Sequence, residues 1–91
     1  MKYEWNGMRF DWDDHKSKAN QEKHGRSFLD SHLVWAQPYG ELLAGNTGSE
    51  ERLVRRGSIE NQVWLCVFTM REDMYRVMSL RPAHQKERDI P

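Results

Sequence analysis

The sequence is poor in the features that mark several common protein classes. Its 91 residues include one cysteine, Cys66, so the chain cannot form an internal disulfide, and a fold that depends on oxidation is excluded. No run approaches the ~20 apolar residues of a membrane-spanning helix. The formal net charge is zero, which disfavours a protein that coats DNA through a basic surface. The first residues form no apolar stretch of signal-peptide length, and we therefore expect a cytoplasmic location.

Aromatic residues, in contrast, are plentiful. A chain of this length buries only about 60% of the surface of its unfolded state, which leaves little margin for stability. The four Trp, three Tyr and three Phe residues compensate, since each can bury roughly 150–250 Å². We therefore expect residues 1–91 to form a single compact domain.

The N-terminal third predicts a β-hairpin followed by an unusual helix. Residues 2–12 alternate between apolar and polar side chains around Asn6-Gly7, which favours a two-residue type I′ turn. Asp11 or Asp13 can then cap a helix that ends at His24. Ala19 is the only apolar residue of that helix, so we expect it to pack through Ala19 and the aliphatic stems of its lysines.

The remaining two thirds predict a second helix and a sheet, which gives an α+β fold class. Residues 63–68 are apolar at successive positions, so a strand there would be apolar on both faces, as a central strand covered on both sides is. The expected architecture is an N-terminal β-hairpin, two helices, an antiparallel meander sheet and a short C-terminal helix. The elements after the first helix are a helix at 27–35 closed by Pro38, a short strand at 40–44, a flexible turn at 45–51, strands at 52–59, 63–70 and 74–81, and a helix at 83–88.

Two segments of the neutral chain are locally basic. One spans residues 15–26, and the other spans residues 71–88. If the fold brings the two segments together, they form a basic surface suited to an anionic partner.

Metal and thiol chemistry find no support in the sequence. The four histidines, His15, His24, His32 and His84, show no i,i+4 pair, and Cys66 has no CxxC partner. We therefore expect neither a metal site nor another cofactor. Cys66 stands in an apolar strand, which is typical of a buried, inert thiol.

The end of the first helix carries the first candidate for catalysis. Lys23, His24 and Gly25 could bind and protonate a phosphate, because histidine titrates near neutral pH and glycine allows close approach of the backbone. A solvated helix C-terminus, where positive side chains complement the helix dipole, is the alternative, and the local sequence alone favours it.

Arginines in the strands are the second candidates. Alternation predicts that Arg81 shares a strand face with Tyr75 and Val77, an unusual position from which its guanidinium could hold a phosphate. A strand-end arginine that reaches solvent is the alternative. Arg52 opens another strand face that continues through Arg56. Arg55 points to the opposite face and is expected to be a solvated charge.

Taken in order, these motifs resemble the BrnT toxin family over about residues 10–88. The N-terminal part of the resemblance is Phe10-Asp11-Trp12-Asp13, Lys16, Asn20, Lys23-His24-Gly25 and Phe28. The C-terminal part is Glu51-Arg52 with Gly57, then Arg76-Val77-Met78-Ser79-Leu80-Arg81-Pro82-Ala83 with Glu87-Arg88.

The resemblance implies a RelE-like endoribonuclease toxin of a type II toxin–antitoxin pair. Such an enzyme would use no metal, would cleave RNA by attack of the 2′-hydroxyl, and would be neutralised by a DNA-binding antitoxin encoded nearby, as a hetero-oligomer. The resemblance implies that Lys23 and His24 transfer protons and that Arg52 and Arg81 clamp phosphate. The residues expected to bind RNA are Lys16, Arg56 and Arg76.

Two other functions remain open. The chain could be a non-catalytic module of the same fold that acts only in an antitoxin–DNA repressor complex. It could also be a small interaction domain that dimerises through exposed Trp and Met side chains. Trp35, Tyr39 and Trp64 are the aromatic residues from which we expect an apolar surface for a partner.

Overall fold

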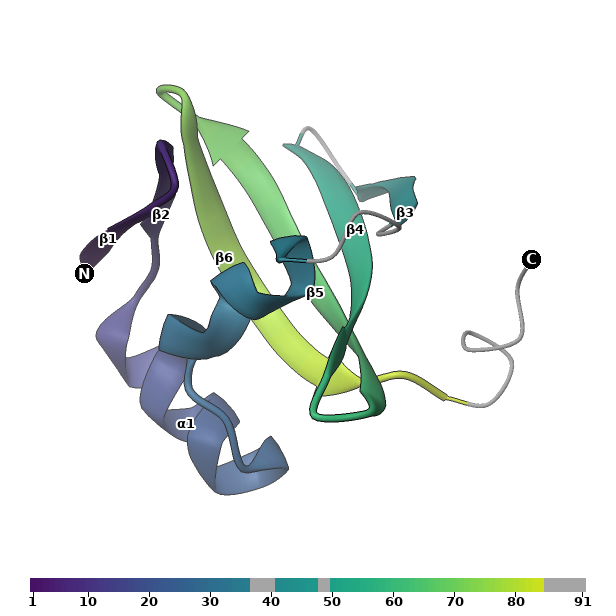
Figure 1. Ribbon diagram of the computed structural model, residues 1–91. Helices are drawn as coiled ribbons and strands as arrows, with labels where there is room; N and C mark the ends of the chain where they lie inside the picture. The colour runs from purple at the N-terminus through teal and green to yellow at the C-terminus, as the bar shows by residue number, and fades with distance from the viewer. Residues whose placement is uncertain (37–40, 48–49, 85–91) are drawn as a thin grey trace.

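The computed structural model describes residues 1–36, 41–47 and 50–84. Within these ranges, six strands form one mixed sheet in the order β1-β2-β6-β5-β4-β3. The 3₁₀ helix η1 crosses one face of the sheet, and the helix α1 lies beside β6 (Figure 1). The elements are β1 (Lys2–Trp5), β2 (Met8–Asp11), α1 (Asp14–His24), η1 (Phe28–Trp35), β3 (Glu41–Thr47), β4 (Glu50–Ile59), β5 (Gln62–Arg71) and β6 (Met74–Pro82).

Most strand pairings in the sheet are antiparallel. β1 pairs with β2 around Asn6 and Gly7, whose φ angles of 52° and 80° are the positive values that a type I′ turn requires. β4, β5 and β6 follow one another as an antiparallel meander, with β3 added beside β4. The α+β class, the two helices and the meander are therefore confirmed. The parallel pairing of β2 with β6 is a feature that local sequence patterns did not predict.

Two of the expected segments differ from the structure. Gly45–Thr47 and Glu50 belong to strands, so the prediction of a flexible turn over 45–51 is wrong for the part that is described. Residues 45–47 are typical of turns, but here they lie in β3, because β3 pairs with β4 along its whole length. Ala83 and His84 are not helical. Residues 85–88 of the expected terminal helix lie outside the described residues, as do Pro38 and Gly40.

The helix α1 is held by its ends and by polar side chains. The carboxylate of Asp13 caps the helix by accepting hydrogen bonds from the backbone N–H groups of residues 15 and 16, and Gly25 ends it with a left-handed φ of 85°. Ala19 is exposed, so the expected packing through this residue is wrong. The buried side chains are those of Ser17 and Asn20. Since α1 carries no apolar stripe, its attachment depends on the hydrogen bonds of these two residues.

The core lies between the sheet and η1. Four aromatic rings pack there with centroids 5.1–5.5 Å apart, namely those of Phe10, Trp35, Phe68 and Tyr75. Trp64 is 4% exposed and Trp35 is half-buried among these rings. The expectation that Trp64 offers an apolar surface to a partner is therefore wrong, because the domain uses this ring for its own core. For the half-buried Trp35 it stays a prediction. Tyr39 lies outside the described residues.

Close contact between η1 and β4 requires a glycine. A Cβ atom at Gly57 would lie 2.5 Å from the carbonyl oxygen of Val34 and 2.8 Å from its Cα. Both are backbone atoms, so a side chain at position 57 would push η1 away from the sheet. The glycine is thus needed for the packing of η1, which the sequence alone did not indicate.

Replacing Gly57 by alanine should lower the free energy of unfolding by about 1–3 kcal/mol, the usual cost of overpacking. Urea denaturation followed by tryptophan fluorescence measures this loss. Ser58→Ala is the control, because residue 58 lies on the opposite face of β4. Equal stability of the two variants would contradict the close approach of η1.

Candidate functional site

A bulge at Met78 decides which face of the sheet carries Arg81. The pairing of β6 with β5 skips Met78, so Val77 and Leu80 both reach the core although they are three residues apart. Arg81 follows Leu80 and therefore lies on the opposite face. The expectation that Arg81 shares a face with Tyr75 and Val77 is wrong, because strict alternation takes no account of the bulge.

We call this opposite face of β4, β5 and β6 the arginine face, because Arg52, Arg56, Arg76 and Arg81 all lie on it by strand register. Arg56 and Arg81 are both Cα partners of Leu65 in β5. Their backbones are therefore two strand spacings apart, which is about 10 Å. Long side chains that flank one strand at this separation can approach one anion together.

Arg52 is not part of that pair. It stands four residues before Arg56 on β4, which corresponds to about 13 Å along the strand. Its side chain is exposed, toward the end of the sheet where Thr69 pairs with Arg76. The structure therefore separates Arg52 from Arg81, the two arginines that were expected to clamp phosphate.

Arg76 is held by an ion pair with Asp11. Its guanidinium donates a hydrogen bond of 2.7 Å to the carboxylate, across the short parallel pairing of β2 and β6. Burial acts to raise the pKa of Asp11, but the hydrogen bond and charge of Arg76 outweigh this effect and lower it. Arg76 and Lys16 line one pocket of about 120 Å³ together with Arg71, so the expected RNA-binding residues Lys16 and Arg76 lie close together.

Arg55 has a structural role, contrary to the expectation of a solvated charge. Its Nε donates to the carbonyl oxygen of Val34 at 3.3 Å, and its guanidinium lies 5.8 Å from the ring centroid of Trp35. Both contacts hold η1 on β4. The arginine is on the helix-covered face, as the alternation predicts, but there it packs against backbone and ring.

His24 lies at the end of α1 between two positive charges. Its side chain is half-buried, whereas that of the neighbouring Lys23 is exposed. Burial, the charge of Lys23 and the charge of Arg81 all lower the pKa of His24. The imidazole is therefore neutral at pH 7 and able to accept a proton. The charge of Arg81 acts on His24, so we assign these two sequence candidates to one candidate site.

Asn20 joins the helix to the strand that carries Arg81. Its Nδ2 donates to the carbonyl oxygen of Leu80 at 2.7 Å, and the N–H of Leu80 donates to its Oδ1 at 3.2 Å. Sequence reasoning included Asn20 in the family motif but gave it no role. The available signal was the position of Asn20 in a helix without an apolar stripe, where a polar side chain has to hold the helix in place.

The other candidates for chemistry are inert or lie elsewhere. Burial raises the pKa of Cys66 to about 12, although the Ser31 hydroxyl opposes this rise, so the thiol stays protonated. In the described part of the chain, no three His, Cys, Asp or Glu side chains gather as metal ligands. No described helix is long and apolar enough to cross a membrane.

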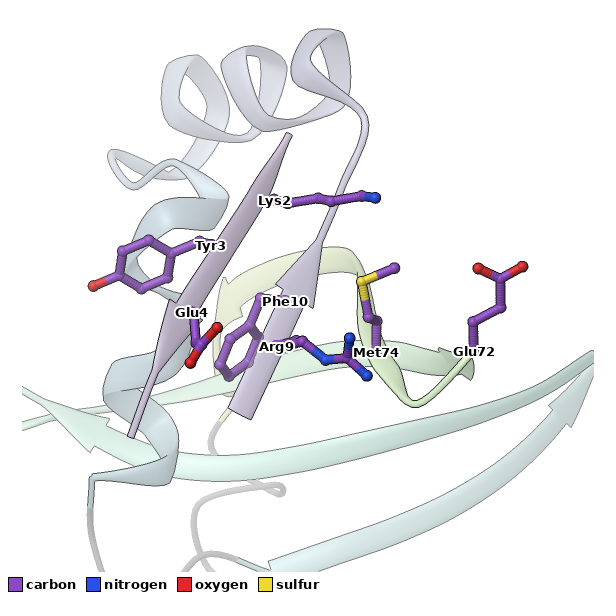
Figure 2. Close-up of a pocket in the computed structure, with 7 residues that line it drawn as sticks. All are labelled: Lys2, Tyr3, Glu4, Arg9, Phe10, Glu72 and Met74. Atoms are coloured by element: carbon purple, nitrogen blue, oxygen red, sulfur yellow. The ribbon is translucent and has the colours of Figure 1, made fainter. Parts of the chain in front are cut away.

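A larger pocket of about 430 Å³ lies at the N-terminal strands, and none of the candidate residues lines it. Figure 2 shows its mixed charges, with Arg9 extending from β2 toward Met74 and with Lys2, Glu4 and Glu72 around them. This mixture of acids and bases is poorly suited to a polyanion.

Replacing Arg81 by glutamine should raise the pKa of His24, because a positive charge that opposes protonation is removed. NMR titration of the imidazole measures the change. Arg52→Gln is the matched control, since it removes the same charge from the far end of the arginine face and should leave the His24 pKa unchanged. Equal effects of the two variants would rule out a specific coupling between His24 and Arg81.

Comparison with known protein families assigns most of the chain to one family. A family model described as the ribonuclease toxin, BrnT, of type II toxin–antitoxin systems matches residues 12–87. Among curated proteins, no match to the sequence was found. The matched segment begins at Trp12, just before α1, ends beyond β6 and includes His24 and Arg81. The chain therefore belongs to the BrnT family of ribonuclease toxins of type II toxin–antitoxin systems.

Proposed function

We propose that this chain is a metal-independent endoribonuclease that cleaves RNA between His24 on α1 and Arg81 on β6. Membership of a ribonuclease toxin family supports RNA as the substrate class. The observation that carries the proposal is the half-buried imidazole of His24, whose pKa is lowered by burial and by the charges of Lys23 and Arg81. A neutral base beside fixed cations is the combination that phosphodiester cleavage by an internal hydroxyl needs.

In the proposed reaction, His24 accepts the proton of the RNA 2′-hydroxyl. The 2′-oxygen forms a bond to the adjacent phosphorus, and the bond from phosphorus to the 5′-oxygen breaks. The leaving 5′-oxygen takes a proton from Lys23 or from water, so the products are a 2′,3′-cyclic phosphate and a 5′-hydroxyl. One positioned general base contributes about 10²–10⁴-fold to such a rate.

Arg81 stabilises the negative charge that builds on the phosphate, and Arg56 joins it from the other side of Leu65. The guanidinium of arginine stays protonated and can hold two phosphate oxygens at once, so it suits charge stabilisation and not proton transfer. Arg52 and the Lys16–Arg76 pocket contact other phosphates of the same RNA strand. This assignment follows the strand register, which separates Arg52 from the pair Arg56 and Arg81.

The proposal extends to the fold relationship, the partner and the location. We assign the fold to the RelE-like group because two helices precede an antiparallel meander. A DNA-binding antitoxin encoded by the neighbouring gene neutralises the toxin in a hetero-oligomer in the cytoplasm. The partner follows from the type II toxin–antitoxin family.

The purified protein should cleave single-stranded RNA in the presence of EDTA, and Arg81→Ala should lower the rate by roughly 10²–10³-fold, the usual loss for one charge-stabilising group. Product analysis should find 2′,3′-cyclic phosphate ends. Arg9→Ala is the control and keeps full activity, because Arg9 lies by the larger pocket on β2. Cleavage that requires a metal ion and survives Arg81→Ala would overturn the proposal.

Induction of the wild-type protein alone should arrest bacterial growth, and either His24→Ala or co-expression of the neighbouring open reading frame should relieve the arrest. Growth curves with immunoblots for soluble protein measure this. Normal growth with abundant wild-type protein would instead favour the non-catalytic module that acts only in a repressor complex.

A further inference from the structure

The carboxamide of Asn20 has an unusual set of partners. The side chain is 8% exposed, and its Nδ2 donates to the carbonyl oxygens of Leu80 and Arg26, both at 2.7 Å. Its Oδ1 accepts the N–H of Leu80 at 3.2 Å. One side chain thereby connects three segments, namely α1, the loop that follows it and β6.

This contact occupies a place that a strand would otherwise fill. β2 pairs with β6 only at Tyr75 and Arg76, so within the described residues no strand pairs with this edge of β6 at Leu80. There the amide of Asn20 satisfies both backbone groups of Leu80, as the peptide group of a neighbouring strand would. The edge of the sheet is closed by a side chain of α1.

Two short connections link the contact to the proposed cleavage site. His24 is four residues after Asn20 on α1, which is about 6 Å along the helix axis. Arg81 is the residue that follows Leu80 on β6. The contact between Asn20 and Leu80 therefore sets the distance between the last turn of α1 and the arginine.

We propose that Asn20 is a positioning residue that holds His24 beside Arg81 by fixing α1 on the edge of β6. The inference rests on the proposed function for its catalytic consequence, but the geometry that it describes can be tested without RNA. Asn20 acts through His24 and Arg81 and does not itself touch the substrate.

Ser17 provides a matched comparison. It is also 8% exposed and also bonds to backbone, since its Oγ accepts the N–H of Phe28 at 2.9 Å. That bond ties α1 to η1 and does not involve β6. Ser17→Ala and Asn20→Ala thus both remove buried polar contacts of α1, but only Asn20→Ala removes the contact with β6.

The first experiment compares the His24 pKa in the two variants by NMR titration, with urea denaturation to identify conditions under which each is folded. The groups that act on the imidazole are Lys23 from α1 and Arg81 from β6. Asn20→Ala should raise the pKa of His24, since the ring gains solvent and Arg81 moves away. Ser17→Ala should leave it unchanged. An unchanged His24 pKa in folded Asn20→Ala would overturn the proposal.

The second experiment measures RNA cleavage as a function of pH in the same variants. Asn20→Ala should lower kcat by roughly 10²-fold, as a displacement of about 1 Å can. The acid limb of its pH profile should move to higher pH, following the raised His24 pKa. Ser17→Ala should keep both the rate and the profile. Equal losses in the two variants, with unshifted profiles, would show that Asn20 contributes stability alone and would overturn the proposal.

Asn20→Ser replaces Asn20→Ala in both experiments if the alanine variant does not fold. The shorter hydroxyl keeps a polar group in the buried position but cannot bridge both backbone groups of Leu80. The two experiments also separate the inferences. A wild-type protein without ribonuclease activity would refute the proposed function, while the titration would still decide whether Asn20 positions His24.

Discussion

The hydrogen bonds between the carboxamide of Asn20 and the backbone of Leu80 are the contact on which the site depends. A helix with no apolar stripe gains little from burial, so α1 relies on a few polar bonds. Each such bond adds only about 1 kcal/mol, but an unpaired buried group costs about 1–3 kcal/mol. This difference selects one docked arrangement of α1. In that arrangement the last turn of the helix meets the strand end that carries Arg81.

The rest of the fold supplies a rigid base for this contact. The aromatic rings and η1 fill the space over one face of the sheet, and Arg55 and Gly57 allow the backbone of η1 to lie close to β4. The main core lies on this face, and the opposite face carries the arginines beside the buried side chains of Leu65 and Thr69. Structural and chemical demands are thereby divided between the two sides of the same strands.

Local patterns predicted the elements well, and non-local contacts account for the rest. Local strand patterns found β4, β5 and β6, and the Asp13 and Gly25 caps defined α1, because these signals depend on near neighbours in sequence. The parallel pairing of β2 with β6 joins segments 65 residues apart and leaves no local pattern. His24 and Arg81 could be named from the sequence, but their proximity could not. Arg55 and Trp64 were misjudged because their partners lie on other elements.

The bulge at Met78 has a consequence for how this sequence can change. Residues on either side of it obey opposite rules of alternation, so one extra residue is what lets Leu80 be internal and Arg81 external. If the same sequence ran as a regular strand, with Met78 paired like its neighbours, the two would exchange, placing a guanidinium in the core and a leucine on the opposite face. Loss of Met78, the unpaired residue, would therefore keep Leu80 internal and Arg81 external, whereas insertion or loss of a paired residue without a compensating bulge would exchange them.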